Sequence, residues 1–537
     1  ANCAIHSANV LLLALLLRLL RLRGPWALVG AVLFALHPVH LENLPYLVGR
    51  ADSLATTFML VGISARIWAS CHGRGRLASA AAAAVASLLC APLAGLCKEP
   101  GFVLLAILAF VGLAQGRCAG PILDLACFVV LVALRSWYVC GMDVGFSFVD
   151  TPVRYAEFAS TRALSYLHQH SVYAQLLLLP WNQSWDYSYD AIPLVRSCAD
   201  VRVLAVVAAY LAVVAMAAHA AAMRSRAAVL AVGLVILPFV PCSNLLFLVG
   251  TTVAERLLYP CTAGWSLLVA AVGCGIVRQR RRPSGPSRHA LLLFWLLALL
   301  YAYRAAVRMW QWRTRVELFR ADMLVWHRSA KVVHQYASLL HGGGMLEEAL
   351  IQYERSLQIF DDNALTDYCV ARIQLELGRY GEAKARFAKI VGGHGIGFGH
   401  HNNFLLAIDY GWLLTRLGQY SDAVPMLQRG LQLHPGAAYA WNALGVAVAN
   451  SATGPRDLQA AMDHLLRAVE MQPRNAVLWS NAAAIASAAG VVEQAAMAAR
   501  NAAAFEPDRE VVAWNAKILL EGVPGQPRLE LFLERLR

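Results

Sequence analysis

The amino-acid sequence predicts an all-α protein, in which a polytopic helical membrane domain is followed by an α-solenoid of helical repeats. Of the 537 residues, 59% are hydrophobic and only 15% are charged, whereas about a quarter of the residues in soluble globular domains are charged. The apolar blocks end near residue 303, and amphipathic helical patterns follow. This composition excludes an ordinary soluble enzyme, a disordered chain and a fibrous protein. We expect a membrane domain over 1–303, a linker helix over 304–335 and a repeat domain over 336–537.

The first part contains ten apolar segments that are long enough, or nearly long enough, to cross a bilayer. They are 9–22, 25–37, 52–70, 77–96, 101–115, 120–140, 201–223, 227–249, 259–277 and 289–303. The stretch 163–180 is also apolar, but it contains two histidines and two glutamines. We interpret it as an interfacial or re-entrant helix within a large loop over 141–200.

The connections between these segments fall into a basic set and a set without basic clusters. The arginine-rich connections are 18–23, 74–76, 117, 224–226 and 278–288. Because basic loops remain in the cytosol, this pattern indicates a membrane protein rather than a nucleic-acid-binding protein, despite the net charge of +13. The loops 37–52, 97–101, 141–200 and 250–258, and everything after 303, then lie in the lumen. The sequon Asn182-Gln-Ser lies in one of these loops, so we expect Asn182 to be glycosylated.

The second part repeats itself with a period of about 34 to 40 residues. Pro435 and Pro473 are each followed six residues later by a tryptophan, and Trp441 opens the sequence Trp-Asn-Ala-Leu-Gly, which matches the W-x2-L-G opening of a tetratricopeptide repeat (TPR). Further units are marked by Gly344, Gly378 and Gly418, and the series ends at Pro507. We expect about five helix pairs, in which small glycine and alanine residues bring the paired helices together. Their concave groove would bind an extended luminal polypeptide.

Neither cysteines nor histidines indicate a metal site. The twelve cysteines form no CxxC pair, and zinc sites need closely spaced ligands. The histidines 394, 400 and 401 lie in a glycine-rich stretch without cysteine or carboxylate neighbours. We therefore expect no bound metal.

Three luminal loops each place a cation beside a carboxylate. The pairs are Arg50 with Asp52, Lys98 with Glu99, and Arg256 with Glu255. Ionisable groups at membrane depth are candidates for function, although each pair could instead only lock a helix end. Because Arg and Lys donate charge-assisted hydrogen bonds to phosphate oxygens, we predict that Arg50, Lys98 and Arg256 bind a lipid-linked phosphate, with Glu99 and Glu255 as supporting carboxylates.

The first luminal loop also offers groups that could accept a proton. Glu42 and Asp52 are carboxylates that could deprotonate an acceptor hydroxyl. His37 and His40 could act as bases as well. We predict these four residues as catalytic candidates.

The order of these motifs resembles the transmembrane and TPR-containing O-mannosyltransferases of the endoplasmic reticulum. The resemblance covers nearly the whole chain and rests on the runs His37-Pro-Val-His-Leu-Glu42, Gly49-Arg-Ala-Asp52, Lys98-Glu99, Phe146-Ser-Phe-Val-Asp150-Thr-Pro152, Leu179-Pro180, Asp186-Tyr187-Ser188, Leu237-Pro-Phe-Val-Pro241-Cys-Ser243-Asn244 and Ala254-Glu-Arg256. It implies a GT-C-like glycosyltransferase fold with luminal repeats. It also implies transfer of mannose from dolichyl-phosphate-mannose, a donor substrate rather than a tightly bound cofactor, to Ser or Thr of secretory-pathway proteins with cadherin-like domains.

Two expectations qualify this resemblance. In this family the main catalytic acid lies in the luminal loop after the first span, and the sequence starts at Ala1 without such a loop. We therefore expect that acid to lie upstream or to be lacking, which leaves Glu42 and Asp52 in second rank. The alternative is a non-catalytic endoplasmic-reticulum membrane scaffold whose repeats bind a luminal partner.

Overall fold

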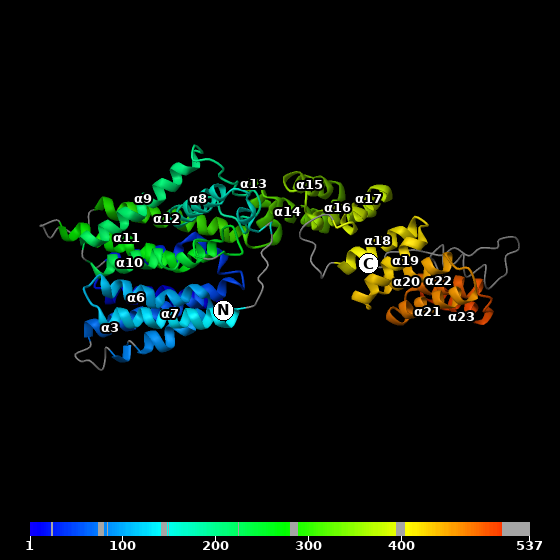
Figure 1. Cartoon of the computed structure of the whole chain (residues 1–537), viewed down its shortest axis with the longest axis horizontal. Coiled ribbons are helices and arrows are strands. Elements are labelled where there is room, and N and C mark those ends of the chain that lie inside the picture. Colours follow the sequence, from blue (N-terminus) through cyan, green and yellow to red (C-terminus); the bar gives the residue numbers. More distant parts are fainter. Residues whose placement is uncertain are drawn as a thin grey trace. The chain divides into compact units, whose positions relative to one another are not determined.

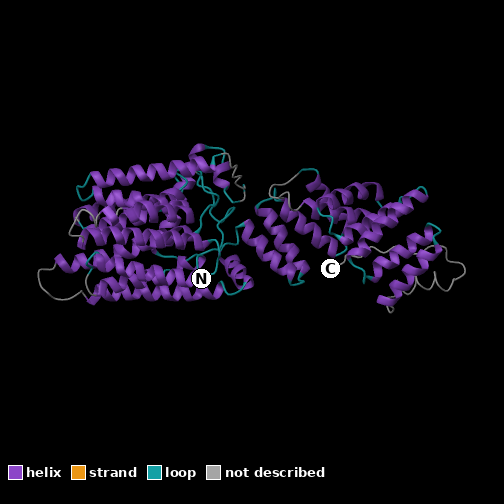
Figure 2. Ribbon diagram, turned by 90° about the horizontal axis from the view of Figure 1, so that it is seen from below, coloured by secondary structure: helices purple, strands orange, loops and turns teal. Residues whose placement is uncertain are grey.

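The computed structural model describes residues 1–22, 25–72, 80–82, 84–140, 148, 150–223, 225–246, 248–279, 288–393 and 403–506, and all regular elements among them are helical (Figure 2). Contacts divide the chain into a membrane unit, Ala1–Tyr336, and a repeat unit, Ala337–Arg537. Some residues named above lie outside the described ranges: Arg74, Arg76, Phe146, Arg224, Arg280, Arg281, Arg282, His394, His400, His401 and Pro507.

The membrane unit consists of helices that run side by side (Figure 1). The longer helices are α1 (Asn2–Leu19), α2 (Pro25–Leu36), α3 (Gly49–His72), α5 (Ala91–Cys97), α6 (Val103–Leu113), α7 (Ala119–Val139), α8 (Ala159–Leu178), α9 (Arg202–Met223), α10 (Arg226–Ile236), α11 (Tyr259–Gln279), α12 (Arg288–Gln311) and α13 (Arg315–Val325). A π-helical segment, η2 (Val85–Cys90), leads into α5. Five 3-10 turns connect other helices: η1 (Pro38–Glu42), η3 (Glu99–Phe102), η4 (Pro152–Tyr155), η5 (Val240–Cys242) and η6 (Glu255–Leu258).

The polytopic fold predicted from the sequence is confirmed. Among the described residues, seven helices are long and apolar enough to cross a membrane: 2–19, 25–42, 49–71, 119–139, 202–223, 255–274 and 291–311. Shorter apolar helices cover 88–97, 99–113 and 226–242. Each of these ten stretches overlaps one of the ten apolar segments predicted above. The helix α8, in which the polar residues interrupt the apolar pattern, is in neither group.

The interior of the membrane unit is built around α11. This helix packs on α10, α2 and α3, and Gly264 lets α11 approach α10 so closely that a Cβ there would lie 2.5 Å from the backbone nitrogen of Val235. In the most apolar 18 residues of α7 and α9 only 6% and 11% are buried, against 83% in the span 255–274 that contains most of α11. The exposed aliphatic faces of α7 and α9 are therefore the surfaces that fit lipid.

The helices of the membrane unit end in two groups, at opposite ends of α3. We call the group around the start of α3 the site end, and the group around the end of α3 the arginine end. At the site end, Asn2 at the start of α1 donates to the carbonyl oxygens of Asn43, Leu44 and Tyr46. The ends of α1 and α3 meet at the arginine end, where the Cys71 thiol lies 3.9 Å from the Leu19 carbonyl oxygen. The site end holds the connections 37–49 and 97–102, and the arginine end holds Arg117 and the start of α10.

A buried ion pair fixes the segment that follows the last apolar helix. Residues 304–335 comprise the end of α12, the helix α13 and the start of α14 (Ala330–Gly342). Arg308 on α12 pairs with Asp322 on α13 at 2.7 Å, and the two side chains are 2% and 1% exposed. This pair anchors α13 on the membrane unit.

The repeat unit is a series of antiparallel helix pairs, as predicted. Four pairs contact each other in succession: α16 (Ala364–Glu376) with α17 (Tyr380–Val391), α18 (Asn403–Arg416) with α19 (Tyr420–Leu433), α20 (Ala438–Asn450) with α21 (Pro455–Met471), and α22 (Ala476–Ala488) with α23 (Val492–Phe505). The helices α14 and α15 (Leu346–Ile359) precede them.

Gly344, Gly378 and Gly418, which mark three units in the sequence, do not themselves bring paired helices together. Their φ angles lie between +74° and +78°, and nothing lies within 4 Å of a Cβ built on them. They follow the first helix of a pair in the left-handed conformation that glycine adopts without strain. The close approach is made elsewhere, because a Cβ on Gly411 would lie 2.7 Å from Cγ of Leu427 in the partner helix.

The six-residue spacing from proline to tryptophan has a direct cause. The indole nitrogens of Trp441 and Trp479 donate to the carbonyl oxygens of Pro435 and Pro473, each at 2.8 Å. Each hydrogen bond joins the first helix of a repeat to the end of the preceding one. The proline and the tryptophan therefore act together to set the step between repeats.

Candidate functional site

An ion pair at the site end joins Glu42 to Arg256. Glu42 ends the η1 turn, and Arg256 lies in the η6 turn, 214 residues further along the chain. One carboxylate oxygen of Glu42 accepts the backbone N–H of Arg256 at 2.9 Å, and the other accepts its guanidinium. The Glu42 side chain is 4% exposed and the Arg256 side chain 18%. Glu42 thus holds both the backbone and the side chain of Arg256 in place.

A second ion pair lies beside the first. Asp52, in the first turn of α3, lies 3.9 Å from the ammonium of Lys98. Asp52 is 4% exposed and Lys98 is 25% exposed. Asp52 interacts electrostatically with both Arg256 and Glu42 as well. We call Glu42, Asp52, Lys98 and Arg256 the rim cluster.

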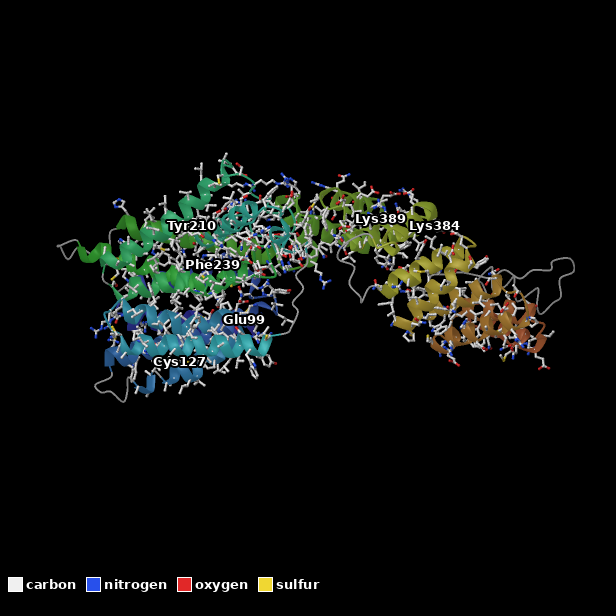
Figure 3. All side chains as sticks on the ribbon, viewed as in Figure 1. Glu99, Cys127, Tyr210, Phe239, Lys384 and Lys389 are labelled. Carbon is white, nitrogen blue, oxygen red and sulfur yellow. The ribbon has the colours of Figure 1, made fainter. Side chains whose placement is uncertain are left out.

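The alternative in which each cation pairs with its sequence neighbour is therefore wrong. Arg50 donates to the side-chain oxygen of Asn2 at 2.8 Å instead of pairing with Asp52. Glu99, labelled in Figure 3, pairs with Arg135 on α7 at 2.6 Å. Adjacent residues in a helical turn point in different directions, so each charge finds its partner on another element.

Glu255, which precedes Arg256 in the η6 turn, is buried and accepts hydrogen bonds from neutral donors. Its carboxylate accepts hydrogen bonds from the side chain of Gln183 at 2.6 Å, the backbone N–H of Ser184 at 2.9 Å and the hydroxyl of Tyr187 at 2.7 Å. Burial, together with this carboxylate, raises the pKa of Tyr187 well above its ordinary value, so the phenol stays protonated. Glu255 therefore anchors the turn that carries Arg256 rather than facing a ligand.

The loop 182–190, which supplies the donors to Glu255, also contacts α13 and α14. The backbone N–H of Trp185 donates to Asp322 at 2.8 Å. Lys331 reaches both Asp150 and Asp186 at 2.8 Å. Burial opposes the charge of Lys331, but the two carboxylates outweigh it and raise the pKa of the ammonium. The sequence motifs contained Asp150 and Asp186 but gave no sign of Lys331, because its partners are more than a hundred residues away.

The two histidines predicted as bases lie inside the protein. His37 and His40 are each 1% exposed. The Nε2 of His37 is 2.9 Å from the carbonyl oxygen of Leu177, and that of His40 is 2.7 Å from the hydroxyl of Thr262. Both rings hold the η1 turn against the helices behind it.

Apolar side chains surround the rim cluster on the surface. In the loop between Glu42 and Asp52, Leu47 is 70% exposed, and Leu96, two residues before Lys98, is 78% exposed. Leu245 and Leu246, which follow the η5 turn, are 61% and 71% exposed. The η5 turn contacts η3, which follows Lys98 directly. A ligand at this site would therefore meet cations and aliphatic surface together.

Two further features bear on ligands. The side chain of Asn182 is exposed at the site end, whereas the neighbouring Ser184 is buried and donates its hydroxyl to the carbonyl oxygen of Asp186 at 2.7 Å. Within the described residues, no three His, Cys, Asp or Glu side chains are grouped as a metal site would require.

Comparison with known proteins confirms the resemblance stated from the motifs. A family profile described as "Protein O-mannosyl-transferase TMTC, DUF1736" matches residues 142–214, and a tetratricopeptide-repeat profile matches 405–447. The mouse protein named "Protein O-mannosyl-transferase TMTC4" is 30% identical over 61% of this chain and 48% of its own length. The Drosophila melanogaster "Protein O-mannosyl-transferase Tmtc3" is 28% identical over 68% of this chain and 44% of its own length.

The match is extensive but partial. The chain spans about half the length of the curated relatives it matches. Among solved structures, a TPR protein described as YrrB, with "an unusual peptide-binding site", is 26% identical and covers 37% of this chain and 97% of its own, with a TM-score of 0.32. The chain is similar to the transmembrane and TPR-containing O-mannosyltransferases across both of its units.

Proposed function

We propose that this chain is an endoplasmic-reticulum membrane glycosyltransferase that transfers mannose from dolichyl-phosphate-mannose to Ser or Thr hydroxyls of secretory-pathway proteins. The observation that carries the proposal is the rim cluster. Its two cations, Lys98 and Arg256, are partly exposed beside two buried carboxylates, and exposed aliphatic residues flank them. A lipid phosphate requires this combination of charge and apolar surface.

The chemistry divides the cluster into three roles. A bond forms between the acceptor oxygen and the anomeric carbon of mannose, while the bond from that carbon to the phosphate oxygen breaks and the lipid phosphate leaves with the electron pair. Lys98 and Arg256 would stabilise the negative charge on the leaving phosphate. Glu42 is engaged by Arg256 through both oxygens, so it is a positioning residue.

Asp52 is the carboxylate left to receive the proton of the acceptor hydroxyl. Its Oδ2 is buried, has no hydrogen-bond partner among the described residues and lies 3.9 Å from the ammonium of Lys98. A carboxylate that is not saturated by donors can accept a proton from a bound hydroxyl. The acceptor polypeptide, for which cadherin-like domains are the expected class, would bind in the groove of the repeat unit.

Binding of the donor is the direct test. The full chain is reconstituted in phosphatidylcholine nanodiscs, and radiolabelled dolichyl-phosphate-mannose is titrated into it. We expect Arg256→Gln and Lys98→Gln each to weaken binding by about tenfold or more, which is the effect of losing one charge-assisted hydrogen bond. Arg328→Gln is the matched control, because Arg328 is 68% exposed and pairs with Asp190 away from the cluster.

The outcomes separate enzyme from scaffold. If both cluster variants bind the donor as well as the original chain does, the phosphate assignment is wrong. If the original chain binds no donor but retains a luminal partner through its repeats, the scaffold alternative replaces the enzyme. Where the donor binds, transfer of label to a Ser/Thr acceptor should then fall at least tenfold in Asp52→Asn.

Glycosylation of Asn182 in cells that express the full chain tests the orientation of the membrane unit. If the site end is luminal, endoglycosidase treatment lowers the apparent mass of the original chain by one glycan and leaves that of Asn182→Gln unchanged. A chain without a glycan at Asn182, combined with cytosolic accessibility of the site end to a membrane-impermeant cysteine reagent, would invert the proposed topology.

A further inference from the structure

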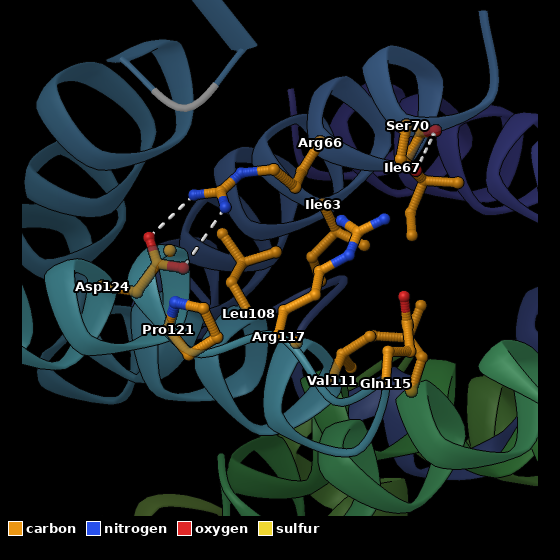
Figure 4. Close-up of a pocket in the computed structure, with 13 residues that line it drawn as sticks. Ile63, Arg66, Ile67, Ser70, Leu108, Val111, Gln115, Arg117, Pro121 and Asp124 are labelled. Atoms are coloured by element: carbon orange, nitrogen blue, oxygen red, sulfur yellow. Dashed lines mark hydrogen bonds and ion pairs between the residues drawn. The ribbon is translucent and has the colours of Figure 1, made fainter. Parts of the chain in front are cut away.

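A small pocket opens at the arginine end of the membrane unit, far from the rim cluster (Figure 4). It lies between the end of α3, the end of α6 and the start of α7, and its free volume is about 100 Å³. Asp52 and Arg66 are both on α3, 14 residues apart, so the pocket is about 21 Å from the rim cluster along that helix. The two places are at opposite ends of the same helix.

The floor of the pocket is apolar. Ile63 and Ile67 of α3, Leu108 and Val111 of α6, and Leu230 of α10 form it. Five polar side chains line the rest of the pocket: Arg66 and Ser70 from α3, Gln115 and Arg117 from the connection between α6 and α7, and Asp124 from α7. The pocket therefore has an aliphatic base and a polar mouth at the level where the spans end.

The polar mouth carries a net positive charge. Arg66 binds Asp124 through both terminal nitrogens, at 2.7 and 3.3 Å, so these two charges cancel. The pair is semi-buried, with Asp124 3% and Arg66 23% exposed. The buried Nε of Arg66 has no hydrogen-bond partner in the described part of the chain. The guanidinium thus keeps one donor unused beside the pocket.

Arg117 supplies the charge that is not cancelled. It lies in the connection between α6 and α7, is exposed, and has no ion-pair partner among the described residues. Figure 4 shows its side chain pointing in from this connection toward the residues of α3. The start of α7, from which Gly120 and Pro121 line the pocket, adds the partial positive charge of a helix N-terminus.

We propose that this pocket binds the phosphate of an anionic phospholipid from the leaflet at the arginine end. Arg117 and the free Nε–H of Arg66 donate to the phosphate oxygens, and Gln115 can add a neutral hydrogen bond. The aliphatic floor covers the glycerol and the first methylenes of the acyl chains. The Arg66–Asp124 pair lines one side of the pocket, and its two hydrogen bonds hold the guanidinium of Arg66 in place beside the phosphate.

The test uses the full chain in nanodiscs of phosphatidylcholine with about one tenth phosphatidic acid, and counts bound lipids by native mass spectrometry. We expect at least one phosphatidic acid to stay bound to the original chain. Arg117→Gln should reduce its occupancy by about tenfold or more, because one charge-assisted contact is lost. Arg226→Gln is the control, since Arg226 is an exposed arginine at the same end and does not line the pocket.

Three results would overturn the proposal. One is that no phosphatidic acid is retained by the original chain. Another is an equal loss in Arg117→Gln and Arg226→Gln, which would show a diffuse effect of surface charge. The third is retention that persists in Arg117→Gln.

Competition with inorganic phosphate identifies the source of the ligand. If millimolar phosphate leaves the bound phosphatidic acid in place, the acyl chains contribute, as proposed. If it removes the lipid and takes its place in an Arg117-dependent way, the pocket is a site for free phosphate and the lipid assignment fails. Donor binding at the rim cluster is measured in the same variants and should not change, so failure here is distinguishable from failure of the proposed function.

Discussion

Some polar contacts of the membrane unit join residues more than 150 positions apart along the chain, whereas the longer-range ones of the repeat unit join neighbouring repeats. Arg256 reaches back 214 residues to Glu42, and Lys331 reaches back 181 residues to Asp150. In the repeats, Tyr368 donates to Asp409, 41 residues later, and Asn442 pairs with Asn481, 39 residues later. Each of these last two bonds spans one repeat.

This difference teaches how each unit holds together. Contacts between adjacent repeats can be lost one at a time, because each repeat depends mainly on its neighbours. Several long-range contacts of the membrane unit meet in the loop 182–190, which binds Glu255, Asp322 and Lys331, so the loss of one of them can loosen the others. We therefore expect larger effects from single substitutions in the membrane unit than in the repeats.

The largest effect should come from the buried pair Arg308–Asp322. Asp322→Asn leaves the guanidinium of Arg308 without its counter-charge at 2% exposure. Breaking a buried pair in this way costs about 3–5 kcal/mol. Thermal unfolding of the full chain in detergent, followed by tryptophan fluorescence, measures the loss.

The control is the double variant Arg308→Met with Asp322→Leu, which removes both charges. It should be closer in stability to the original chain than either single variant, since neither member of the pair stays buried without the other. A single variant as stable as the original would show that the pair does not anchor α13.

Glycine substitutions compare the packing of the two units. A Cβ on Gly264 would lie 2.5 Å from a backbone nitrogen, which cannot move aside, so Gly264→Ala should cost about 3 kcal/mol. In Gly411→Ala the nearest atoms belong to the side chain of Leu427, which can rotate, and the cost should be nearer 1 kcal/mol. Hydrogen exchange of peptides from α10 measures the loss of stability in Gly264→Ala, and that of peptides from α18 measures the loss in Gly411→Ala.

Gly381→Ala is the matched control in the repeats. Gly381 lies in α17, with nothing within 4 Å of its added Cβ. Alanine should stabilise this helix by about 0.5–1 kcal/mol, because glycine loses more backbone freedom on folding. Destabilisation in this variant would contradict the account of close approach.

The sequence predicted what is local or periodic and missed what is distant. Ten apolar segments and the TPR units follow from patterns within about 40 residues, and all appear as helices. The sequence also placed Glu42, Asp52, Lys98 and Arg256 on one side of the membrane. It did not predict that Glu42 binds Arg256, because their proximity depends on how α2 and α11 pack.

Two errors show the limit of patterns more sharply. Gly378 and Gly445 both follow a leucine in similar repeats, yet the first ends a helix with a φ of +75° and the second contacts Leu465 in the partner helix. His37 and His40 look like exposed loop histidines in the sequence, and only the packing of α8 and α11 over them reveals their burial. Residue type alone therefore does not separate a structural role from a chemical one.

Buried and exposed histidines should respond differently to acid. Burial lowers the pKa of His334, in α14, to about 4. The folded protein then holds a neutral imidazole, while the unfolded chain takes up a proton below its ordinary pKa of about 6.5. Stability is lost as the pH falls from about 6.5 toward 4, and the loss at pH 5 should be about 2 kcal/mol.

Unfolding of the original chain and of His334→Gln at pH 7 and pH 5 measures this contribution. The variant should lose about 2 kcal/mol less than the original chain over that interval. His434→Gln serves as the control, because His434 in the repeat unit is exposed. If both variants show the pH dependence of the original chain, His334 is not the responsible group.

The smallest effect is expected for an ion pair within the repeats. Asp367 is fully buried, but it is shared by Arg386 at 2.7 Å and Lys389 at 2.7 Å. Lys389→Met removes one cation from a side chain that is 43% exposed and leaves the other in place. Because Asp367 stays paired, the loss should be below about 1 kcal/mol.

Lys384→Met is the control and lies on the same helix (both lysines are labelled in Figure 3). It removes a lysine for which the described residues show no ion pair, so its effect should be smaller still. Local hydrogen exchange of α16 distinguishes the two. A loss in Lys389→Met as large as that in Asp322→Asn would mean that the repeats, too, depend on single buried charges, and the contrast between the two units would disappear.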